Sequence, residues 1–268
     1  MDVRRGLTPQ IVGIVLVHNE DVFVEQAIRN VVGFCDRIHA VDHVSTDGTW
    51  DVLRRLAGEY GHVDARRLHH AGDSHRIVEQ YAATPTWVFG VDGDELYDPA
   101  RLGAFRDELL GGSYDQAFKV AANVLNCVEL AGGRAKGYLS PPSRSITKLY
   151  NFAALESWRG DGAERLHGGA PVFRTGFSER SVDNIGERVS WDETPLRCLH
   201  MCFLRRSSSD AGATIRPILE ETSMHDRTWM GALKRRLRGR RAPDASEWKR
   251  EKYMRGDLVT VDAAPFFG

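Results

Sequence analysis

The sequence predicts an α/β protein with a mostly parallel, Rossmann-like central sheet that is flanked by helices. Two observations support this prediction. Apolar runs of strand length alternate with segments of helical periodicity along residues 11–98, and the connections between them are short. Such alternation is typical of parallel strands joined by right-handed crossovers. With 268 residues, 42% of them hydrophobic, the chain can bury the core of one large α/β domain.

The first strand is expected at 11–17, where a continuous apolar run indicates burial on both faces. A helix follows from residue 22, with Asn19 or Asp21 as its cap. The same alternation then continues. The next elements are a strand at 37–41 that ends at Asp42, a turn at 45–49, a helix at 50–60, a strand at 63–68, a helix at 74–83 and a strand at 87–91.

The pattern changes after Pro99, and we divide the chain into residues 1–98, 99–205 and 206–268. The middle segment is expected to hold a short helix, several strands and one loop rich in glycine and charge. These elements are a helix at 101–110, a strand or hairpin arm at 116–128, a turn at Gly132 and Gly133, a strand at 147–152, the loop at 158–169 and short strands within 171–205. The last segment is polar and basic.

The bulk composition excludes several classes of protein. A formal net charge of -1 gives no global field that would draw the chain onto nucleic acid. The sequence has no apolar stretch of transmembrane length and no secretory signal, and its four cysteines form no C-x-x-C pair, so a cytoplasmic protein is expected. Thirty arginines against six lysines suggest a bacterium with a GC-rich genome.

Two aspartates separated by one residue follow the strand at 87–91, in the run Asp92-Gly93-Asp94-Glu95. A strand that ends in this way places two carboxylates at the carboxyl edge of the sheet, where open α/β sheets bind ligands. Paired carboxylate oxygens suit Mg²⁺ or Mn²⁺, which can bridge a diphosphate. The simpler alternative is that these aspartates only stabilise a turn.

Cys198, His200 and Cys202 are a second candidate metal cluster. The region has the alternation of a strand, on which residues two apart lie about 6.5 Å from each other. Three such side chains converge poorly on one zinc ion, so a zinc site is not expected. His200 on its own is a candidate third metal ligand, and the alternative is a packed core histidine.

Residues 11–98 resemble the nucleotide-sugar half of family 2 glycosyltransferases, which have the GT-A fold. Four elements in order carry the resemblance: Val17-His18-Asn19-Glu20, Asp42, Ser45-Thr46-Asp47-Gly48-Thr49 and Asp92-Gly93-Asp94-Glu95. Residues 147–205 are similar to a subgroup of that family through Lys148-Leu149-Tyr150, Leu166-His167-Gly168 and Leu199-His200-Met201. The chain departs from the family at His43-Val44 and at Gly168, where the subgroup usually has a glutamate.

The resemblance implies a single GT-A domain and a metal-dependent glycosyltransferase. The donor would be a nucleoside diphosphate sugar, with UDP as the expected nucleotide, and the acceptor a hydroxyl or amine in natural-product or glycan biosynthesis. Residues 1–98 would bind the nucleotide sugar, and 99–205 would bind the acceptor and carry the catalytic base. Residues 206–268 lie outside the resemblance, and their polar, basic composition leads us to expect a C-terminal extension on the acceptor side or a lid.

The resemblance also implies roles for individual residues. Asp94, with Asp92 and His200, would hold Mn²⁺ or Mg²⁺. The nucleotide-binding candidates are Val17, Asn19, Glu20, Asp42, Arg76, Asp92 and Gly93. The base candidates are Glu164, Asp161 and His167 in the loop at 158–169. For Asp42 the alternative is a helix cap, for Arg76 a solvated helix face, and for the base candidates ordinary loop charges.

Two other functions remain open. A nucleotidylyltransferase also places carboxylates and a metal beside a nucleotide, but it normally has a glycine-rich basic loop after the first strand, where this chain has His18-Asn19-Glu20-Asp21. A non-catalytic nucleotide-binding module is the other alternative, and the intact Asp92/Asp94 pair argues against it. Neither a Gly-x-Gly-x-x-Gly fingerprint nor a Walker loop is present. The sequence leaves room for a homo-oligomer.

Overall fold

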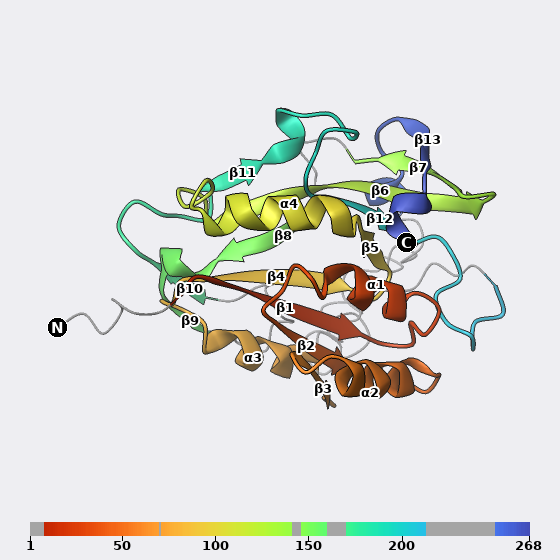
Figure 1. The fold of residues 1–268 in the computed structure, drawn as a ribbon, viewed down its shortest axis with the longest axis horizontal. Helices are drawn as coiled ribbons and strands as arrows, with labels where there is room; N and C mark the ends of the chain where they lie inside the picture. Colours follow the sequence, from red (N-terminus) through yellow and green to blue (C-terminus); the bar gives the residue numbers. More distant parts are fainter. Residues whose placement is uncertain (1–7, 70, 141–145, 160–169, 213–249) are drawn as a thin grey trace, which may run out of the picture.

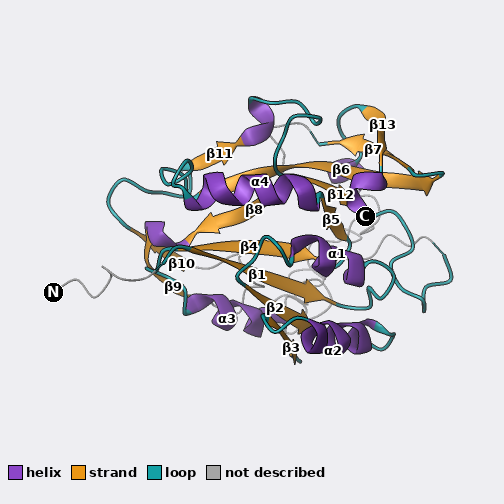
Figure 2. Ribbon diagram, viewed as in Figure 1, coloured by secondary structure: helices purple, strands orange, loops and turns teal. Residues whose placement is uncertain are grey.

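The computed structural model describes residues 8–69, 71–140, 146–159, 170–212 and 250–268. In this part of the chain the fold is α/β, with a large curled sheet that has helices packed on it and a separate small sheet (Figures 1 and 2). The small sheet pairs β9 (Leu155–Arg159) with β10 (Ala170–Phe173). The expected α/β fold class, with a central sheet flanked by helices, is confirmed.

The parallel part of the large sheet comes from the N-terminal half of the chain. Its strands are β1 (Gln10–Val17), β2 (Arg37–Asp42), β3 (Val63–Arg67) and β4 (Thr86–Asp92). They lie in the order β3-β2-β1-β4, and every neighbouring pair is parallel. The chain therefore steps outward from β1 to β3 and then crosses to the other side of β1, which makes the gap between β1 and β4 the point where the strand order reverses.

Helices connect these parallel strands. They are α1 (Val24–Val31), α2 (Thr49–Glu59) and α3 (His75–Glu79), and the short 3-10 helix η1 (Ala71–Ser74) precedes α3. The helix expected at 74–83 ends early because Ala83 has a φ of 65° and Thr84 precedes a proline, which disfavours helical geometry. α1 packs its apolar face on the sheet through Val24, Ala27, Ile28 and Val31, which are all fully buried.

The sheet becomes mixed beyond β4. β4 pairs antiparallel with β8 (Ile146–Asn151), and the path continues through β6 (Lys119–Ala131), β7 (Arg134–Leu139) and β13 (Leu258–Asp262). Three short strands lie off this path: β5 (Glu95–Tyr97), β11 (Val182–Asn184) and β12 (Arg197–His200). The hairpin between β6 and β7 turns at Gly132 and Gly133, as expected, and both glycines have a positive φ.

Further helices are α4 (Pro99–Leu110) and the 3-10 helices η3 (Phe152–Ala154), η4 (Ile185–Glu187) and η5 (Ala264–Phe266), and residues 250–253 are also helical. Asp98 caps α4 through its side chain, and Pro99 occupies the first turn, a position where the missing N–H is not needed. Phe34, Phe89 and Phe105 stack between α1, α4 and the sheet in the core. Full burial of each such ring contributes roughly 2–3 kcal/mol.

Residues 250–268 return to the body of the fold. β13 pairs antiparallel with β7 at the sheet edge, and the fully buried Phe266 stacks on Trp191. The Asn30 amide nitrogen in α1 donates to the Phe266 carbonyl at 2.9 Å. Part of the segment that the sequence assigns to an extension thus contributes to the sheet and the core. Within the residues that the structure describes, no helix is long and apolar enough to cross a membrane.

Candidate active site

The candidate site lies at the carboxyl ends of β1 and β4, where the strand order reverses. The loop after β1 carries Glu20, and Asp92 ends β4. The next strand, β5, begins at Glu95 and pairs with β12, so that Glu95 is the register partner of His200. The Met201 N–H donates to the Asp94 carbonyl at 2.8 Å. The sheet therefore brings three separate parts of the chain to one edge, as expected for a ligand site in such folds.

Gly93 is required by the close approach of this turn to β1. A Cβ atom at position 93 would lie 2.5 Å from Glu20 Oε2 and 2.6 Å from Val17 Cγ1, distances that real Cβ contacts do not show. With any other residue at position 93, either the Glu20 and Val17 side chains or the turn itself would have to shift. Glycine at this position lets the Glu20 carboxylate pack directly against the turn between Asp92 and Asp94.

Asp94 forms a buried ion pair with Arg206. Arg206 Nη1 lies 2.6 Å from Asp94 Oδ2 and 3.3 Å from Glu20 Oε1, so that one nitrogen serves two carboxylates. Burial would raise the pKa of Asp94, but the charge of Arg206, together with that of His200 when its ring is protonated at low pH, outweighs burial and holds that pKa below its usual value. Asp94 is therefore ionised at neutral pH. Arg206 Nε is buried and has no hydrogen-bond acceptor among the described residues.

Lys148 forms the second buried ion pair of the site. Its Nζ lies 2.6 Å from Glu95 Oε1 and 3.4 Å from Asp92 Oδ2. Burial raises the pKa of Glu95 to about 7, although Lys148 opposes the shift. The Asp92 side chain keeps 31% of its surface exposed, while Glu95 is fully buried. Of the two carboxylates that Lys148 contacts, Asp92 is therefore the one that is exposed to solvent.

His200 lies beside Asp94, with Nε2 3.7 Å from Asp94 Oδ2. The other ring nitrogen, Nδ1, lies 2.9 Å from the Asn126 side-chain oxygen. Burial lowers the pKa of His200 to about 4, so the imidazole is neutral at neutral pH even though Asp94 and Asp92 oppose the shift. A neutral imidazole next to two carboxylates combines the nitrogen and oxygen ligands that suit Mn²⁺.

We call the carboxylates of Glu20, Asp92, Asp94 and Glu95 the acidic cluster. Lys148 and Arg206 are cations that pair with the acidic cluster. Four carboxylates that gather in a largely buried site repel one another, and burying them is costly unless cations compensate their charge.

The chemistry of these residues fits a divalent cation, but they do not yet form a complete coordination sphere. No group of three histidine, cysteine or acidic side chains in the described ranges is close enough to hold a metal ion. Asp94 and His200 approach each other, while Asp92 is held toward Lys148. The donor types, carboxylate oxygens and one imidazole nitrogen, fit Mn²⁺ or Mg²⁺.

The neighbouring loop at the end of β2 is tightly tied. The Asp42 carboxylate, fully buried, accepts from the Ser45 N–H and pairs with Arg67 Nε at 2.6 Å. Asn19 Oδ1 accepts from the Thr46 N–H at 2.7 Å, and Asn19 has a φ of 53°. Val44, a β-branched residue, also has a positive φ of 51°. Such strain is concentrated at functional sites and costs about 1–3 kcal/mol per residue.

Residues 205–210, which we call the serine strap, fasten this loop to the site. Ser207 Oγ donates to Asp47 Oδ2 at 2.5 Å, and the Ser208 N–H donates to Asp21 Oδ1 at 2.7 Å. The Val22 N–H donates to the Arg206 carbonyl at 3.1 Å. Because Arg206 lies within the strap, the contacts to Asp21 and Asp47 also position its guanidinium against Asp94.

The structure thus brings together six of the predicted site residues: Val17, Glu20, Asp92, Gly93, Asp94 and His200. Asn19 and Asp42 lie in the adjoining loops, where they hold the turn at 45–49. Arg76 is exposed and pairs with Asp73 at 3.6 Å. The base candidates Glu164, Asp161 and His167 lie outside the described residues, so their role stays a prediction.

Two residues of the site had no assigned role in the sequence prediction: Lys148 and Asn126. Lys148 belongs to the Lys148-Leu149-Tyr150 motif, so it carried a weak signal. Asn126 is a polar residue in the middle of an apolar strand, and it is fully buried. A buried polar residue of this kind needs hydrogen-bond partners, which only the folded structure identifies.

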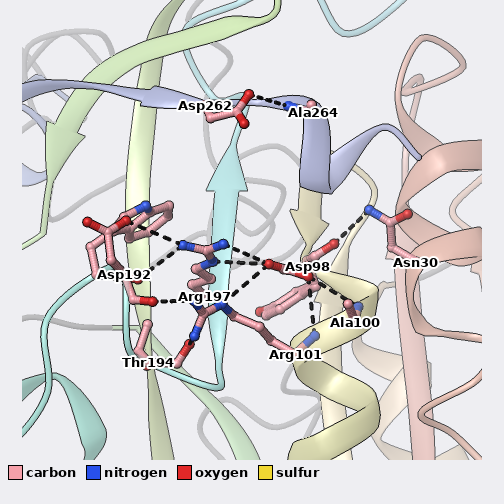
Figure 3. Close-up of polar contacts among 11 residues, drawn as sticks. Asn30, Asp98, Ala100, Arg101, Asp192, Thr194, Arg197, Asp262 and Ala264 are labelled. Carbon is pink, nitrogen blue, oxygen red and sulfur yellow. Dashed lines mark hydrogen bonds and ion pairs between the residues drawn. The ribbon is translucent and has the colours of Figure 1, made fainter.

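A second buried aspartate–arginine pair is formed by Asp98, four residues after Asp94, and Arg197 (Figure 3). Asp98 Oδ2 accepts from Arg197 Nη2 at 2.8 Å and from Arg197 Nε at 3.2 Å. Asp98 Oδ1 accepts from the N–H groups of Ala100 and Arg101 at the start of α4. The Arg197 side chain also donates to the Trp191 carbonyl. This pair holds β12 against the start of α4.

Comparison with solved structures finds a likeness to the S. aureus protein TarS (fragment 1-349), with a TM-score of 0.37 and 14% identity over 57% of this chain and 51% of that chain. A second likeness is to the mannosyltransferase PcManGT from Pyrobaculum calidifontis in complex with GDP-Man and Mn2+, with a TM-score of 0.34 and 18% identity over 44% of this chain and 36% of that chain. The chain thus spans about half and about a third of these two chains. No family model and no curated protein matches the chain.

Proposed function

We propose that the chain is a metal-dependent glycosyltransferase that moves a sugar from a nucleoside diphosphate sugar, with UDP as the nucleotide, to a hydroxyl or amine acceptor. The observation that carries the proposal is the acidic cluster, whose four carboxylates gather beside His200 at the carboxyl ends of β1 and β4. Carboxylate oxygens at this point of an α/β sheet suit a divalent cation that bridges to a diphosphate. The ordered elements shared with family 2 glycosyltransferases supply the reaction class.

Asp94, Asp92 and His200 would hold Mn²⁺ or Mg²⁺ through two carboxylates and one imidazole. When bound, the ion neutralises charge on the diphosphate leaving group as the bond to the sugar breaks. Gly93 and Val17 keep the two aspartates close to the end of β1. Lys148 fixes the position of Asp92 through its ion pair and limits the repulsion between Asp92 and Glu95.

The loops after β1 and β2 would bind the nucleoside. Asp42 is assigned as the acceptor for a base N–H or a ribose hydroxyl, and Asn19 holds the turn at 45–49 beside it. Glu20 would lie on the same side through its contact with Gly93. Arg76, exposed near the start of α3, is assigned to a phosphate. The proton of the acceptor hydroxyl would pass to Glu164, Asp161 or His167.

The metal role can be tested by isothermal titration calorimetry of UDP binding with Mn²⁺ or with EDTA. Asp94→Asn keeps the size of the side chain and removes its charge, so the Mn²⁺-dependent part of UDP binding should be lost. Asp98→Asn is the matched control, because Asp98 is also buried and paired with an arginine. The control protein should be less stable but should keep Mn²⁺-linked binding. Unchanged affinity in Asp94→Asn would contradict the metal role.

The products distinguish the proposed reaction from its alternatives. A glycosyltransferase releases UDP from UDP-sugar when an acceptor is present, whereas a nucleotidylyltransferase releases pyrophosphate from a nucleoside triphosphate and a sugar phosphate. A non-catalytic nucleotide-binding module releases neither. We expect Mn²⁺-dependent release of UDP, measured on a panel of UDP-sugars with hydroxyl and amine acceptors. Pyrophosphate release, or turnover that EDTA leaves unchanged, would be evidence against the proposal.

A further inference from the structure

We infer that Asn126 is a positioning residue that keeps His200 Nε2 unprotonated and directed at Asp94, so that this nitrogen is available as a metal ligand. The inference rests on the proposed metal-dependent function and extends it to a residue of β6 that does not itself touch the metal. It follows from the orientation of one buried amide, from the hydrogen bond that this amide imposes on the imidazole, and from the group that the second ring nitrogen faces.

The orientation of the Asn126 amide is fixed by its surroundings. Its nitrogen Nδ2 lies 3.1 Å from the Tyr253 carbonyl and 3.0 Å from Ser140 Oγ. A carbonyl can only accept a hydrogen bond, so the atom that faces Tyr253 has to be the NH₂ group. The opposite end of the amide, Oδ1, therefore faces His200. Because Asn126 is fully buried, a flipped amide would leave the Tyr253 carbonyl facing an oxygen.

This orientation determines which nitrogen of His200 carries the proton. The amide oxygen of Asn126 is an acceptor only, and it lies 2.9 Å from His200 Nδ1, so Nδ1 must be the donor. A neutral imidazole has one N–H, and Nε2 is then left with its lone pair.

The lone pair of Nε2 faces a carboxylate instead of a proton donor. Nε2 lies 3.7 Å from Asp94 Oδ2, so two acceptors approach each other in a buried site. Such a pair is repulsive unless a cation lies near both atoms. Arg206 Nη1 supplies part of that charge at Asp94 Oδ2. A divalent cation held by Asp94 and Nε2 would turn the repulsion into coordination.

The imidazole ring has little freedom to escape this arrangement. In the sheet, His200 is the register partner of Asn126 on one side and of Glu95 on the other. The Tyr253 ring packs against the imidazole at 5.3 Å between centroids, with an interplanar angle of 89°. A core histidine with a purely structural role would direct Nε2 at a donor or at apolar atoms. Here the partner of Nε2 is the carboxylate of the candidate metal site.

The tautomer can be measured directly in the metal-free protein. Histidine labelled with ¹⁵N reports the protonation of each ring nitrogen through long-range ¹H–¹⁵N correlation, and His200→Gln identifies the signals of His200. The wild type is expected to show Nδ1–H with an unprotonated Nε2. A protonated Nε2 would overturn the inference, and this outcome does not depend on whether any variant folds or any metal binds.

The effect on metal binding is tested with Mn²⁺ alone, by calorimetry or electron paramagnetic resonance. Asn126→Leu keeps the volume and removes the acceptor of Nδ1, and loss of such a partner typically weakens metal affinity by about 10–100-fold. Ser140→Ala is the control, because it removes one partner of Nδ2 while the Tyr253 carbonyl still fixes the amide. It should leave both the tautomer and the Mn²⁺ affinity of the wild type unchanged.

The possible failures are distinguishable. If Mn²⁺ binding depends on Asp94 but Asn126→Leu and His200→Gln leave it unchanged, this inference is wrong and the proposed function stands. If the wild type binds no Mn²⁺, the metal-dependent function and this inference both fail. If Asn126→Leu does not fold, the affinity of His200→Gln and the wild-type tautomer decide in its place.

Discussion

The molecule has two buried aspartate–arginine pairs, Asp94–Arg206 and Asp98–Arg197, whose aspartates are four residues apart in the sequence. The pairs differ in how completely their hydrogen-bonding atoms find partners. Asp98 receives two hydrogen bonds from Arg197 and two from the first N–H groups of α4 (Figure 3). Arg197 in turn donates to the Trp191 carbonyl and lies 5.6 Å from the Trp191 ring. Arg101 Nε also lies 3.6 Å from Asp98 Oδ2, and Arg197 Nη1 lies 3.7 Å from Asp192 Oδ1. Both Asp98 and Arg197 therefore have several partners.

The Asp94 pair is left incomplete. Arg206 uses one nitrogen for both Asp94 and Glu20, and its buried Nε has no acceptor in the described part of the chain. The difference teaches that a buried ion pair alone does not mark a ligand site. A sign of such a site is a buried polar atom, such as Arg206 Nε, that has no hydrogen-bond partner among the described residues.

The largest expected effect comes from removing each arginine. Arg197→Met and Arg206→Met should each lose about 3–5 kcal/mol of unfolding free energy, because a buried carboxylate loses the cation nearest to it. The two variants should then differ in their response to Mn²⁺. Mn²⁺ should recover much of the loss in Arg206→Met, where it can replace the missing charge at Asp94, and none of it in Arg197→Met.

The measurement is urea unfolding of both variants and the wild type, with EDTA and with saturating Mn²⁺. Wild-type stabilisation by Mn²⁺ gives the baseline, since any ligand of the folded state raises stability by mass action. An equal response of the two variants to Mn²⁺ would remove the distinction between a structural pair and a ligand site.

A smaller effect is expected from Glu95, whose pKa is raised from 4.5 to about 7 by burial. Between these two values the folded protein holds a proton that the unfolded chain has released, so stability falls as pH rises from about 4.5 to about 7. The contribution over this window is on the order of 3 kcal/mol. Glu95→Gln should remove it, so unfolding in EDTA should depend less on pH than in the wild type. Parallel pH profiles of the two proteins would exclude Glu95 as the titrating group.

The smallest expected effect concerns backbone strain at the ligand edge. Val44 has a φ of 51°, a conformation that β-branched residues avoid and asparagine tolerates. Val44→Asn should therefore stabilise the fold by about 1 kcal/mol. Thermal unfolding measures the gain, and a control at Val22, an exposed valine outside this turn, should show no gain. A destabilised Val44→Asn protein would mean that packing of the valine side chain outweighs the strain.

The sequence predicted the parallel half of the fold well, because β1, β2 and β4 are apolar runs buried on both faces. It did not predict β5 and β13, which are short and depend on distant partner strands. The acidic part of the site could be read from local motifs. Arg206 and Asn126 could not, because they meet Asp94 and His200 across 112 and 74 residues of chain. Only the tertiary fold makes those pairs.

The order of these partners along the chain also bears on how the protein folds. Arg206 follows Glu20 by 186 residues and Asp94 by 112, and Phe266 follows Asn30 by 236. Closing such long loops costs conformational entropy before the contacts form, which slows folding. The carboxylates of the acidic cluster therefore stay hydrated until the segment that carries His200 and Arg206 docks. Assembly of the site is expected to be a late event in folding, and changes in that segment should slow folding as well as weaken ligand binding.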